Sequence, residues 1–549
     1  MNLKFALLAF AATGLLTTSA VAQSYAITNA KIVTVSGPTI ERGTVVVRDG
    51  LIMAVGADAK APADAQVFDG TGMTVYPGFV DALTNVGIQA RTATPTPAGG
   101  TTAAVAAQPA AQPNSNYPVG LRPEAIATDD LRGGDAQFEA VRNAGFTTVV
   151  TVGRTGIFNG RSAIINLAGE NVSAMIVKSP FAEHISFTTV GGGTYPGSLL
   201  GTFSALRQMF LDAQRLQEIQ KMYASNPKGM KRPDADASLE ALFPIINREM
   251  PIVFNANREV EIIRALDLAK EFNLKAIVGG GQEAWKLTDR LKAQDVPVLL
   301  SLNFPKRTTA ASSDADPESM DLLRFRAETP KTAAKLQQAG VKFAFQSGGA
   351  TALVDFFTNA GKAVENGLSL DAAIRSMTLG SAEILGVSDR LGSIDTGKIA
   401  NLAMVKGDLF GKDRYVSQVF VDGKPFEQKA AAEKPGTTAG RTPTTAPGTI
   451  ARVGGNYSIV IEVPGQQLTG TMALTQQAGV ITGSLQTQLG SSPIRDGKVT
   501  ADGFSFGATV EFGGTQVEIN VKGTVTGNQV SGTIDSPQGT VPFTGTRNP

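Results

Sequence analysis

Residues 75–85 read VYPGFVDALTN, and they stand where the pattern of the sequence changes. Before them, in 25–56, β-branched residues alternate with polar ones, and the alternation is broken at Ser36-Gly37-Pro38 and at Asp49-Gly50. This pattern predicts short antiparallel strands joined by turns. After them, apolar runs of strand length alternate with stretches of helical periodicity, which predicts βα units.

The region that follows predicts an α/β fold of the TIM type, a barrel of parallel strands surrounded by helices. Most of its predicted strands are apolar throughout, as parallel strands buried on both faces are. The predicted strands are 146–152, 162–167, 174–179, 251–256, 275–280, 296–303 and 342–347. The clearest predicted helices, with apolar residues three and four apart, are 260–272, 283–294 and 331–340.

Two stretches rich in Ala, Pro and Thr interrupt this organisation. Residues 92–116 are expected to form a loop inserted after the first barrel strand, and residues 428–450 are expected to form a linker. Beyond the linker, residues 451–549 consist of alternating runs with glycines inside them. They predict an all-β module, a small barrel or sandwich, in which the glycines ease the curvature of the strands.

The first 22 residues have the composition of a secretory signal. A positive charge at Lys4 precedes an apolar run, and small residues at Ala20 and Ala22 follow it. We expect cleavage after Ala22 and export to the periplasm or the medium. No later segment offers the roughly 20 apolar residues of a membrane-spanning helix, so no membrane span is expected.

Composition excludes several kinds of site and partner. Lys plus Arg is 49 against 48 for Asp plus Glu, and no basic block marks a nucleic-acid surface, so nucleic acid is not an expected partner. The chain has no Cys, which excludes disulfides, a thiolate nucleophile and thiolate metal ligands.

The segment 75–81 (VYPGFVD) resembles the start of the first barrel strand in the amidohydrolase superfamily, among the imidazolonepropionase-like metal-dependent hydrolases. The closing stretches 367–369, 389–394 and 397–398 resemble that family's last helix and its return strands. The resemblance spans roughly residues 25–425. It implies a barrel over 78–390 and a composite β-sandwich built from 23–77 and 391–427.

The family resemblance also implies where metal ligands would stand. Such hydrolases hold one or two divalent metals with four His, an Asp and sometimes a modified Lys, and the metal generates the attacking hydroxide. The corresponding positions here are Leu83, Asn85, Asn255, Gly280 and the neighbourhood of Gly348, and none of these residues is a zinc ligand. The whole chain has one His, so no other alignment restores the set. We therefore expect no bound zinc and no other cofactor.

Three residues remain as weak catalytic candidates. His184 is expected just beyond a barrel strand, where a surface or satisfied loop histidine is the favoured interpretation and a catalytic base the alternative. Asp81 is more simply a support of the strand end than a general base. Glu283 is more simply a residue that favours the N-terminus of its own helix than a catalytic carboxylate.

Four uncharged residues are expected to line the mouth of the barrel, because each stands at the C-terminal end of a predicted strand. They are Asn85, Asn255, Gln346 and Ser347. Together they predict a neutral hydrogen-bonding pocket.

These observations leave three functional hypotheses open. The favoured one is a non-catalytic binding or partner subunit, whose partner is a related active amidohydrolase or a second copy of the chain. The alternative is an active hydrolase of amide or other C–N bonds that uses a divergent site. In a third hypothesis, the C-terminal module binds a ligand or a surface while the barrel supports it.

Overall fold

In a computed structural model, the chain forms two compact units, Met1–Arg307 with Glu318–Ala432, and Thr308–Pro317 with Glu433–Pro549. The residues that the structure describes are 24–88, 117, 120–134, 136–153, 155–169, 171–188, 195–307, 318–349, 353, 355–427, 453–463, 466–477, 479–487, 490–499, 503–512, 515–526, 529–536 and 539–547. The predicted signal 1–22, insertion 92–116 and linker 428–450 lie outside them.

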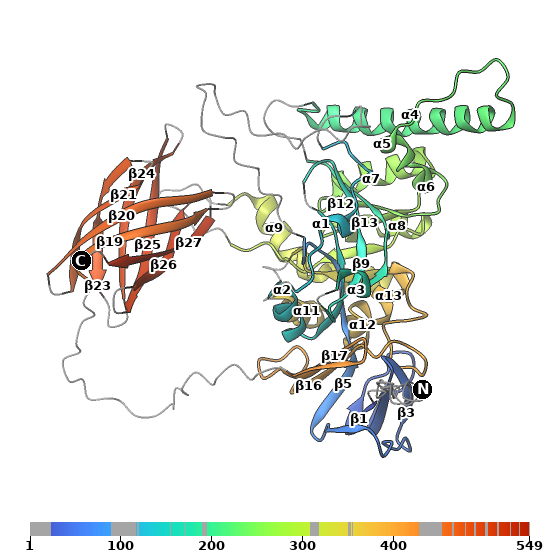
Figure 1. The fold of residues 1–549 in the computed structure, drawn as a ribbon, viewed down its shortest axis with the longest axis horizontal. Helices are drawn as coiled ribbons and strands as arrows, with labels where there is room; N and C mark the ends of the chain where they lie inside the picture. Colours follow the sequence, from blue (N-terminus) through green and yellow to red (C-terminus); the bar gives the residue numbers. More distant parts are fainter. Residues whose placement is uncertain are drawn as a thin grey trace, which may run out of the picture. The chain divides into compact units, whose positions relative to one another are not determined.

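One sheet combines strands from both flanks of the first unit. Strand β5 pairs in parallel with β1 and antiparallel with β16, which joins the N-terminal strands to the return strands (Figure 1). The strands of this sheet are β1 (Ser24–Ile32), β2 (Ile40–Arg48), β3 (Leu51–Gly56), β4 (Gln66–Asp69), β5 (Met73–Pro77), β16 (Leu402–Lys406), β17 (Tyr415–Val421) and β18 (Lys424–Glu427).

Two further sheets lie between these flanks. In one, β6 (Phe79–Thr84) runs parallel to β7 (Phe146–Thr151), and β9 (Ala163–Asn166) and β10 (Ile176–Lys178) follow antiparallel. In the other, five consecutive neighbours run parallel and β8 (Phe158–Arg161) is antiparallel at the edge. The five are β11 (Glu183–Ser186), β12 (Ile252–Ala256), β13 (Ala276–Gly280), β14 (Val298–Ser301) and β15 (Phe343–Gln346).

The two sheets adjoin at both edges. At one edge, Ser162 lies between β8 and β9, and its amide donates to Ala182 O at 2.8 Å. At the other edge, the amide of Gly348 after β15 donates to Leu83 O in β6 at 3.1 Å. The structure is therefore of the α/β class with mixed sheets, as the sequence predicted at that level.

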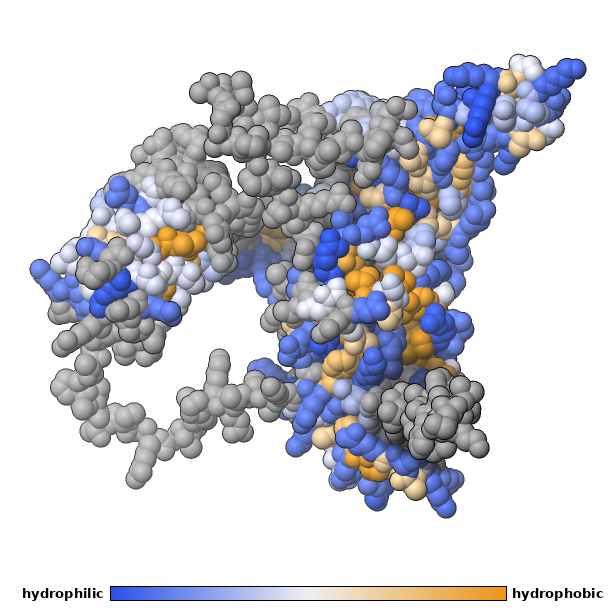
Figure 2. Space-filling view, in the orientation of Figure 1, coloured by the Kyte–Doolittle hydropathy of each residue, from blue (hydrophilic) through white to orange (hydrophobic). Residues whose placement is uncertain are grey.

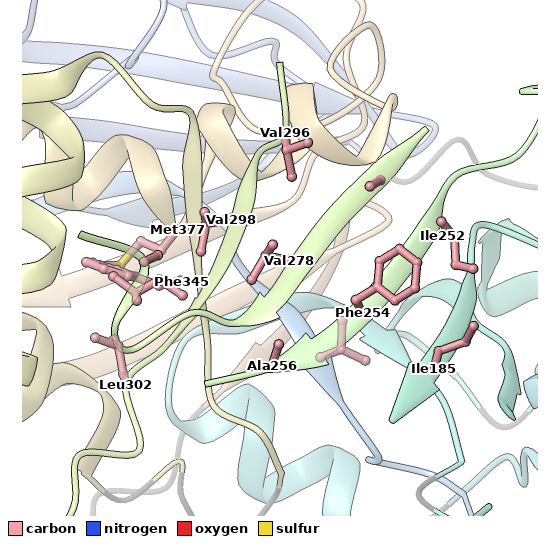
Figure 3. Close-up of a cluster of buried hydrophobic side chains, with 14 of the residues drawn as sticks. Ile185, Ile252, Phe254, Ala256, Val278, Val296, Val298, Leu302, Phe345 and Met377 are labelled. Atoms are coloured by element: carbon pink, nitrogen blue, oxygen red, sulfur yellow. The ribbon is translucent and has the colours of Figure 1, made fainter. Parts of the chain in front are cut away.

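Strands β11 to β15 are buried on both faces. On one face, Ile185, Ile252, Phe254, Val278 and Val298 belong to the large apolar cluster shared with the helices (Figure 3). On the other face, Val253, Ile277, Leu299 and Ala344 form a second cluster with Leu83 of β6. This double burial explains why β12 to β15 are largely apolar, whereas Ile185 is the one apolar residue of β11.

The helices follow the strands in the order expected of βα units. They are α1 (Ala127–Asp130), α2 (Ala136–Asn143), α3 (Val172–Met175), α4 (Leu199–Ser225), α5 (Ala237–Glu240), α6 (Phe243–Ile246), α7 (Glu259–Glu271), α8 (Thr288–Ala293), α9 (Met320–Glu328), α10 (Thr332–Ala339), α11 (Phe356–Glu365), α12 (Leu370–Ser376) and α13 (Leu379–Leu385), with 3-10 turns η1 (Ala284–Lys286) and η2 (Thr329–Lys331). In α7, Ile262, Leu266 and Ala269 recur at helical spacing and are buried. No described helix is long and apolar enough to cross a membrane.

Helix α4 was not predicted. Its buried residues, from Thr202 to Ala213, lie in its first half, and its second half is mostly hydrophilic at the surface (Figure 2). Such a helix has a weak apolar periodicity, because only half of it packs against the rest of the unit.

The sequence also assigned one strand wrongly. Residues 174–179 were predicted as a barrel strand, but they form the end of α3 and the short antiparallel strand β10. The strand that pairs in parallel with β12 is β11, which the sequence analysis missed. With four residues, two of them charged or ionisable, β11 has no apolar run to reveal it.

The C-terminal unit is an all-β, barrel-like sheet, as predicted. Its neighbours are all antiparallel, and the β19–β27 and β20–β21 pairings bring the strand order back on itself. The strands are β19 (Gly455–Val463), β20 (Gln466–Gln477), β21 (Val480–Thr487), β22 (Gly490–Pro493), β23 (Arg495–Val499), β24 (Phe504–Phe512), β25 (Thr515–Thr526), β26 (Gln529–Ser536) and β27 (Gly539–Arg547). A Cβ at Gly483 would overlap Ala473 O, and one at Gly532 would overlap Lys522 O, so these close strand approaches require glycine.

Candidate functional site

Uncharged polar side chains gather where the parallel strands end. Asn255 is the penultimate residue of β12, Gln346 is the last residue of β15, and Asn85 directly follows β6. The hydrogen bond from the amide of Gly348 to Leu83 O brings the ends of β15 and β6 together. The structure thus places these residues at the carboxyl ends of the strands, the end at which TIM-type barrels carry their active sites.

Asn255 belongs to a compact hydrogen-bond network. Its Nδ2 donates to Asn159 Oδ1 at 3.0 Å and to Ser186 Oγ at 3.1 Å, and Ser186 Oγ donates to Asn159 Oδ1 at 2.7 Å. Asn159 Nδ2 donates in turn to Gly156 O at 3.1 Å. These bonds fix the orientation of the Asn255 amide at the end of β12.

Other polar atoms at these strand ends are buried and have no hydrogen-bond partner in the described structure. Among the described residues, Thr84 Oγ1, Asn85 Oδ1 and Gln346 Oε1 have no hydrogen-bond partner. Thr84 and Gln346 are only 2% and 4% exposed. A buried oxygen without a partner costs about 1 to 3 kcal/mol, so a water or a ligand that donates to these oxygens would stabilise the structure.

Two of the positions implied for metal ligands, Leu83 and Asn255, both lie close to Gly279, the neighbour of Gly280. A Cβ placed on Gly279 would lie 2.7 Å from Asn255 Oδ1 and 3.5 Å from Leu83 Cδ2. At Gly280, the position that the resemblance implies, a Cβ would lie 2.5 Å from Asn257 Oδ1, and the backbone φ is +97°. A leucine, an amide and a glycine offer neither imidazole nor carboxylate, so this set does not fit zinc.

Asp81 is fully buried and ties β6 to the end of β15. The backbone amide of Ser347 donates to Asp81 Oδ1 at 2.9 Å, and Ser347 Oγ donates to Asp81 Oδ2 at 2.5 Å. Ser347 therefore faces Asp81 and helps to hold the strand ends, together with the amide of Gly348. This geometry is that of a strand-end support.

His184 is neither on the surface nor in a loop, and that prediction was wrong. It lies within β11, is fully buried, and its Nε2 is 2.9 Å from Ser162 Oγ. Its Nδ1 has no partner in the described structure. Burial lowers the pKa of His184 to about 3, so the imidazole is neutral near pH 7.

Glu183, the neighbour of His184, is also fully buried. Burial raises the pKa of its carboxyl well above the ordinary value, although the charge of Arg161 and the amides of Gly160 and His184 act in the opposite sense. In the pairing of β8 with β11, Glu183 stands opposite Arg161.

Glu283 stabilises a helix, but not the one that follows it. Its Oε2 accepts from the amide of Glu259 at 2.8 Å, at the start of α7, and its Oε1 lies 3.1 Å from Lys286 Nζ. Burial opposes its ionisation, yet this amide and the charges of Lys286 and Arg258 hold its pKa below the ordinary value. It is thus an N-terminal anchor for α7 rather than for its own turn.

Sequence reasoning missed Thr84, Asn159 and Ser186 as parts of this end of the strands. Ser186 could have been found only by assigning β11, and Asn159 sits in β8, a strand too short to be recognised. Thr84 precedes Asn85 directly and was overlooked because the family motif draws attention to its neighbours.

Comparison with known structures finds a similar fold in an amidohydrolase. An amidohydrolase from Thermotoga maritima MSB8 superposes with a TM-score of 0.60 at 24% identity, covering 74% of this chain and 100% of its own. Weaker likenesses are a Xaa-Pro dipeptidase with bound methionine (TM-score 0.43, 18% identity, 74% and 100% covered) and molinate hydrolase (TM-score 0.43, 14% identity, 77% and 99% covered). No curated protein sequence matches the chain.

A family model matches the segment that contains β15, the last helices and the return strands. Residues 315–426 match the Amidohydrolase family. This match and the shared fold agree with the resemblance of the motif at 75–81 to the amidohydrolase superfamily.

Proposed function

We propose that this chain is an exported member of the superfamily that binds a neutral, amide-bearing ligand at the carboxyl ends of its strands without hydrolysing it. In this proposal it acts as a binding or partner subunit. The family's chemistry, hydrolysis of C–N bonds by a metal-bound hydroxide, is absent because the residues that would hold the metal are absent.

One observation carries the proposal: Leu83 and Asn255, which stand where the resemblance implies metal ligands, both lie next to Gly279. Leu83 Cδ2 and Asn255 Oδ1 lie close to the space that a side chain on Gly279 would need. The place of the metal is therefore filled by an apolar side chain and a hydrogen-bonded amide. Zinc binds nitrogen, sulfur and carboxylate ligands, and these residues supply none in the required number.

The ligand class follows from the unsatisfied atoms. Asn85 and Gln346 each carry a primary amide, with a donor and an acceptor on one planar group, and a ligand amide can pair with both. A charged ligand would lose its hydration without gaining a counter-charge, which is costly in a buried place. A neutral peptide-like amide avoids that cost.

The proposal includes a closed TIM-type barrel. The antiparallel segment β8–β9 pairs with β11 through its first half and with β7 through its second half. It would thus take the place of one parallel strand between β7 and β11, while the contact of β15 with β6 closes the ring. In such a barrel, Asn85, Asn255 and Gln346 face one mouth.

The alternative, an active hydrolase with a divergent site, has less support. Asp81 is held by Ser347, Glu283 is engaged at the start of α7, and His184 sits within β11 beside Ser162. In the described structure, no pair among these three has a hydrogen bond between its side chains, so they are not arranged as a nucleophile and its base.

The test uses the mature protein from its native export route, with cleavage after Ala22 checked by intact mass. We expect less than about 0.1 zinc per chain by elemental analysis and no turnover of amide and dipeptide substrates. Blocked dipeptides serve as binding probes in calorimetry. Gln346→Leu should weaken binding about tenfold, because a buried amide partner is worth about 1.4 kcal/mol.

The control is Gln208→Leu, which removes an exposed amide on α4 and should leave binding unchanged. Tightly held zinc at one per chain with hydrolysis abolished by chelation would overturn the non-catalytic proposal. Co-purification from the native host tests the partner role. A specific interface buries on the order of 1,200 Å² or more and should survive size exclusion at micromolar concentration.

A further inference from the structure

A large cavity opens at the other end of the same strands. Its volume is about 1250 Å³. Its lining includes the residues that directly precede β12, β13, β14 and β15, which are Pro251, Lys275, Pro297 and Lys342. None of Asn85, Asn255 and Gln346 lines it. It is therefore separate from the site proposed above.

The lining of this cavity is strongly cationic. It contains seven Lys or Arg residues and three Asp or Glu residues, an excess of four positive charges. The whole chain carries 49 basic and 48 acidic residues, so the excess is local. Like charges that share one cavity raise each other's energy, and a bound anion relieves that repulsion.

Some of these charges are already neutralised, and others are not. Lys342 pairs with Asp295 at 3.0 Å and Arg375 with Glu383 at 2.6 Å. Within the described part of the chain, Lys178, Lys275 and Arg248 have no carboxylate within 4.0 Å. Glu249 is the one acid of the lining not engaged in such a pair.

Helix ends account for only part of the charge. Lys270 lies in the last turn of α7 and Arg375 in that of α12, where the helix dipole favours a cation. Lys178 belongs to β10, Lys275 precedes β13, and Arg248 lies in the loop after α6, so this explanation does not cover them. The Arg248 guanidinium is held in place because it donates to Asn273 O at 2.8 Å and to Asn273 Oδ1 at 2.9 Å.

The floor of the cavity is apolar. Phe181, Met250, Ile277, Val296 and Val341 line it, and each is less than a tenth exposed. Lys178 Nζ stands 5.6 Å from the centroid of the Phe181 ring, at the border between floor and rim. An apolar floor below several cations fits a ligand that has an apolar body and more than one negative group.

We propose that this cavity binds an organic anion with two or more negative charges. The unpaired Lys178, Lys275 and Arg248 recognise its charged groups, and the apolar floor receives its body. The carboxyl ends of the strands and this cavity are then two independent sites on one set of strands.

Pyranine, a fluorescent aromatic trisulfonate, is a suitable probe for the full mature protein. Its anisotropy should show saturable binding at low salt that weakens as ionic strength rises, because screening reduces exposed charge interactions. The double variant Lys178→Gln with Lys275→Gln should lose at least tenfold in affinity. The matched control, Lys498→Gln with Lys522→Gln in the C-terminal unit, removes the same charge and should change affinity less than twofold.

Both lysines of the test pair are exposed, so the variant should fold, and circular dichroism checks that it does. Displacement by mellitate identifies a preference for carboxylates, and displacement by inositol hexakisphosphate a preference for phosphates. No saturable binding, or an equal loss in both double variants, would overturn the proposal. Binding of blocked dipeptides should be unaffected by pyranine, which separates this site from the proposed function.

Discussion

The two ends of the parallel strands carry different chemistry. At the carboxyl ends stand Asn85, Asn255 and Gln346, which are uncharged and partly unsatisfied. At the amino ends, a cavity of about 1250 Å³ is bordered by seven cationic side chains. Between the two lies an apolar layer that includes Val253, Ile277 and Leu299.

This difference shows that packing and chemistry are separable on one set of strands. The apolar layers that hold the strands together need only volume and shape, and they do not depend on which polar groups stand at either end. The polar residues at one end can therefore differ from those of a related protein while the fold persists.

The largest effect should come from the support at the carboxyl ends. Asp81→Ala removes the acceptor of the Ser347 amide and hydroxyl and leaves buried donors unsatisfied. We expect a loss of about 4 kcal/mol in the free energy of unfolding. Urea denaturation followed by tryptophan fluorescence measures it, since Trp285 is the only tryptophan and lies in the first unit.

The matched control is Asp58→Ala, an exposed aspartate outside any strand, which should stay within about 0.5 kcal/mol of the wild type. A comparably small change for Asp81→Ala would mean that Asp81 is not the strand-end support described here.

Acid should lower the free energy of unfolding through His184, which lies in the layer between the two ends. Its pKa is lowered from 6.5 to about 3 by burial, so below pH 6.5 the unfolded chain takes up a proton that the folded chain does not. Stability should then fall by about 1.4 kcal/mol per pH unit as pH falls toward 3, or about 3 kcal/mol at pH 4. His184→Leu should remove this part of the acid sensitivity.

The measurement is the difference between variant and wild type in urea unfolding at pH 7 and pH 4. Ser162 Oγ keeps its hydrogen bond to Ala182 O in the variant, so the comparison isolates the imidazole. An equal acid loss in both proteins would show that the imidazole is protonated in the folded state.

Glu183 should produce the opposite pH dependence. Burial raises its pKa above the ordinary 4.5, so above pH 4.5 the unfolded chain loses a proton that the folded chain retains. Stability contributed by this group is present at low pH and declines as pH rises toward its folded pKa. Glu183→Gln, which keeps the size of the side chain, should be more resistant to urea than the wild type at pH 8 and lack that advantage at pH 4.

The sequence predicted the fold best where both faces of a strand are apolar. Residues 275–280 and 251–256 were predicted as strands, and β13 and β12 lie there, because a run of buried apolar residues leaves few alternatives. It failed at 183–186, where Glu183 and His184 are fully buried against expectation, and burial of ionisable residues depends on tertiary contacts that a sequence does not display.

The candidate site was predicted in part for a similar reason. The predicted bounds of the strands placed Asn255 and Gln346 correctly at the carboxyl ends, because the position of a residue along a strand follows from the sequence. The direction in which each side chain points does not, because a shift of one residue along a strand turns the side chain to the opposite face. The partner of Glu283 was also hidden, because the amide of Glu259 is close only in the folded chain.

The smallest effect should come from Glu283, which anchors the start of α7 next to the carboxyl ends. Its carboxylate accepts from Glu259 N and lies near Lys286 and Arg258, and a lost helix cap costs about 1 kcal/mol. Glu283→Ala should therefore destabilise the first unit by about 1 kcal/mol, whereas Glu283→Gln keeps an acceptor and should lose about half as much. Glu365→Ala, an exposed residue at the end of α11, is the control and should be neutral. If Glu283→Ala instead left stability unchanged but altered dipeptide binding, Glu283 would belong to the ligand site and the anchoring role would be wrong.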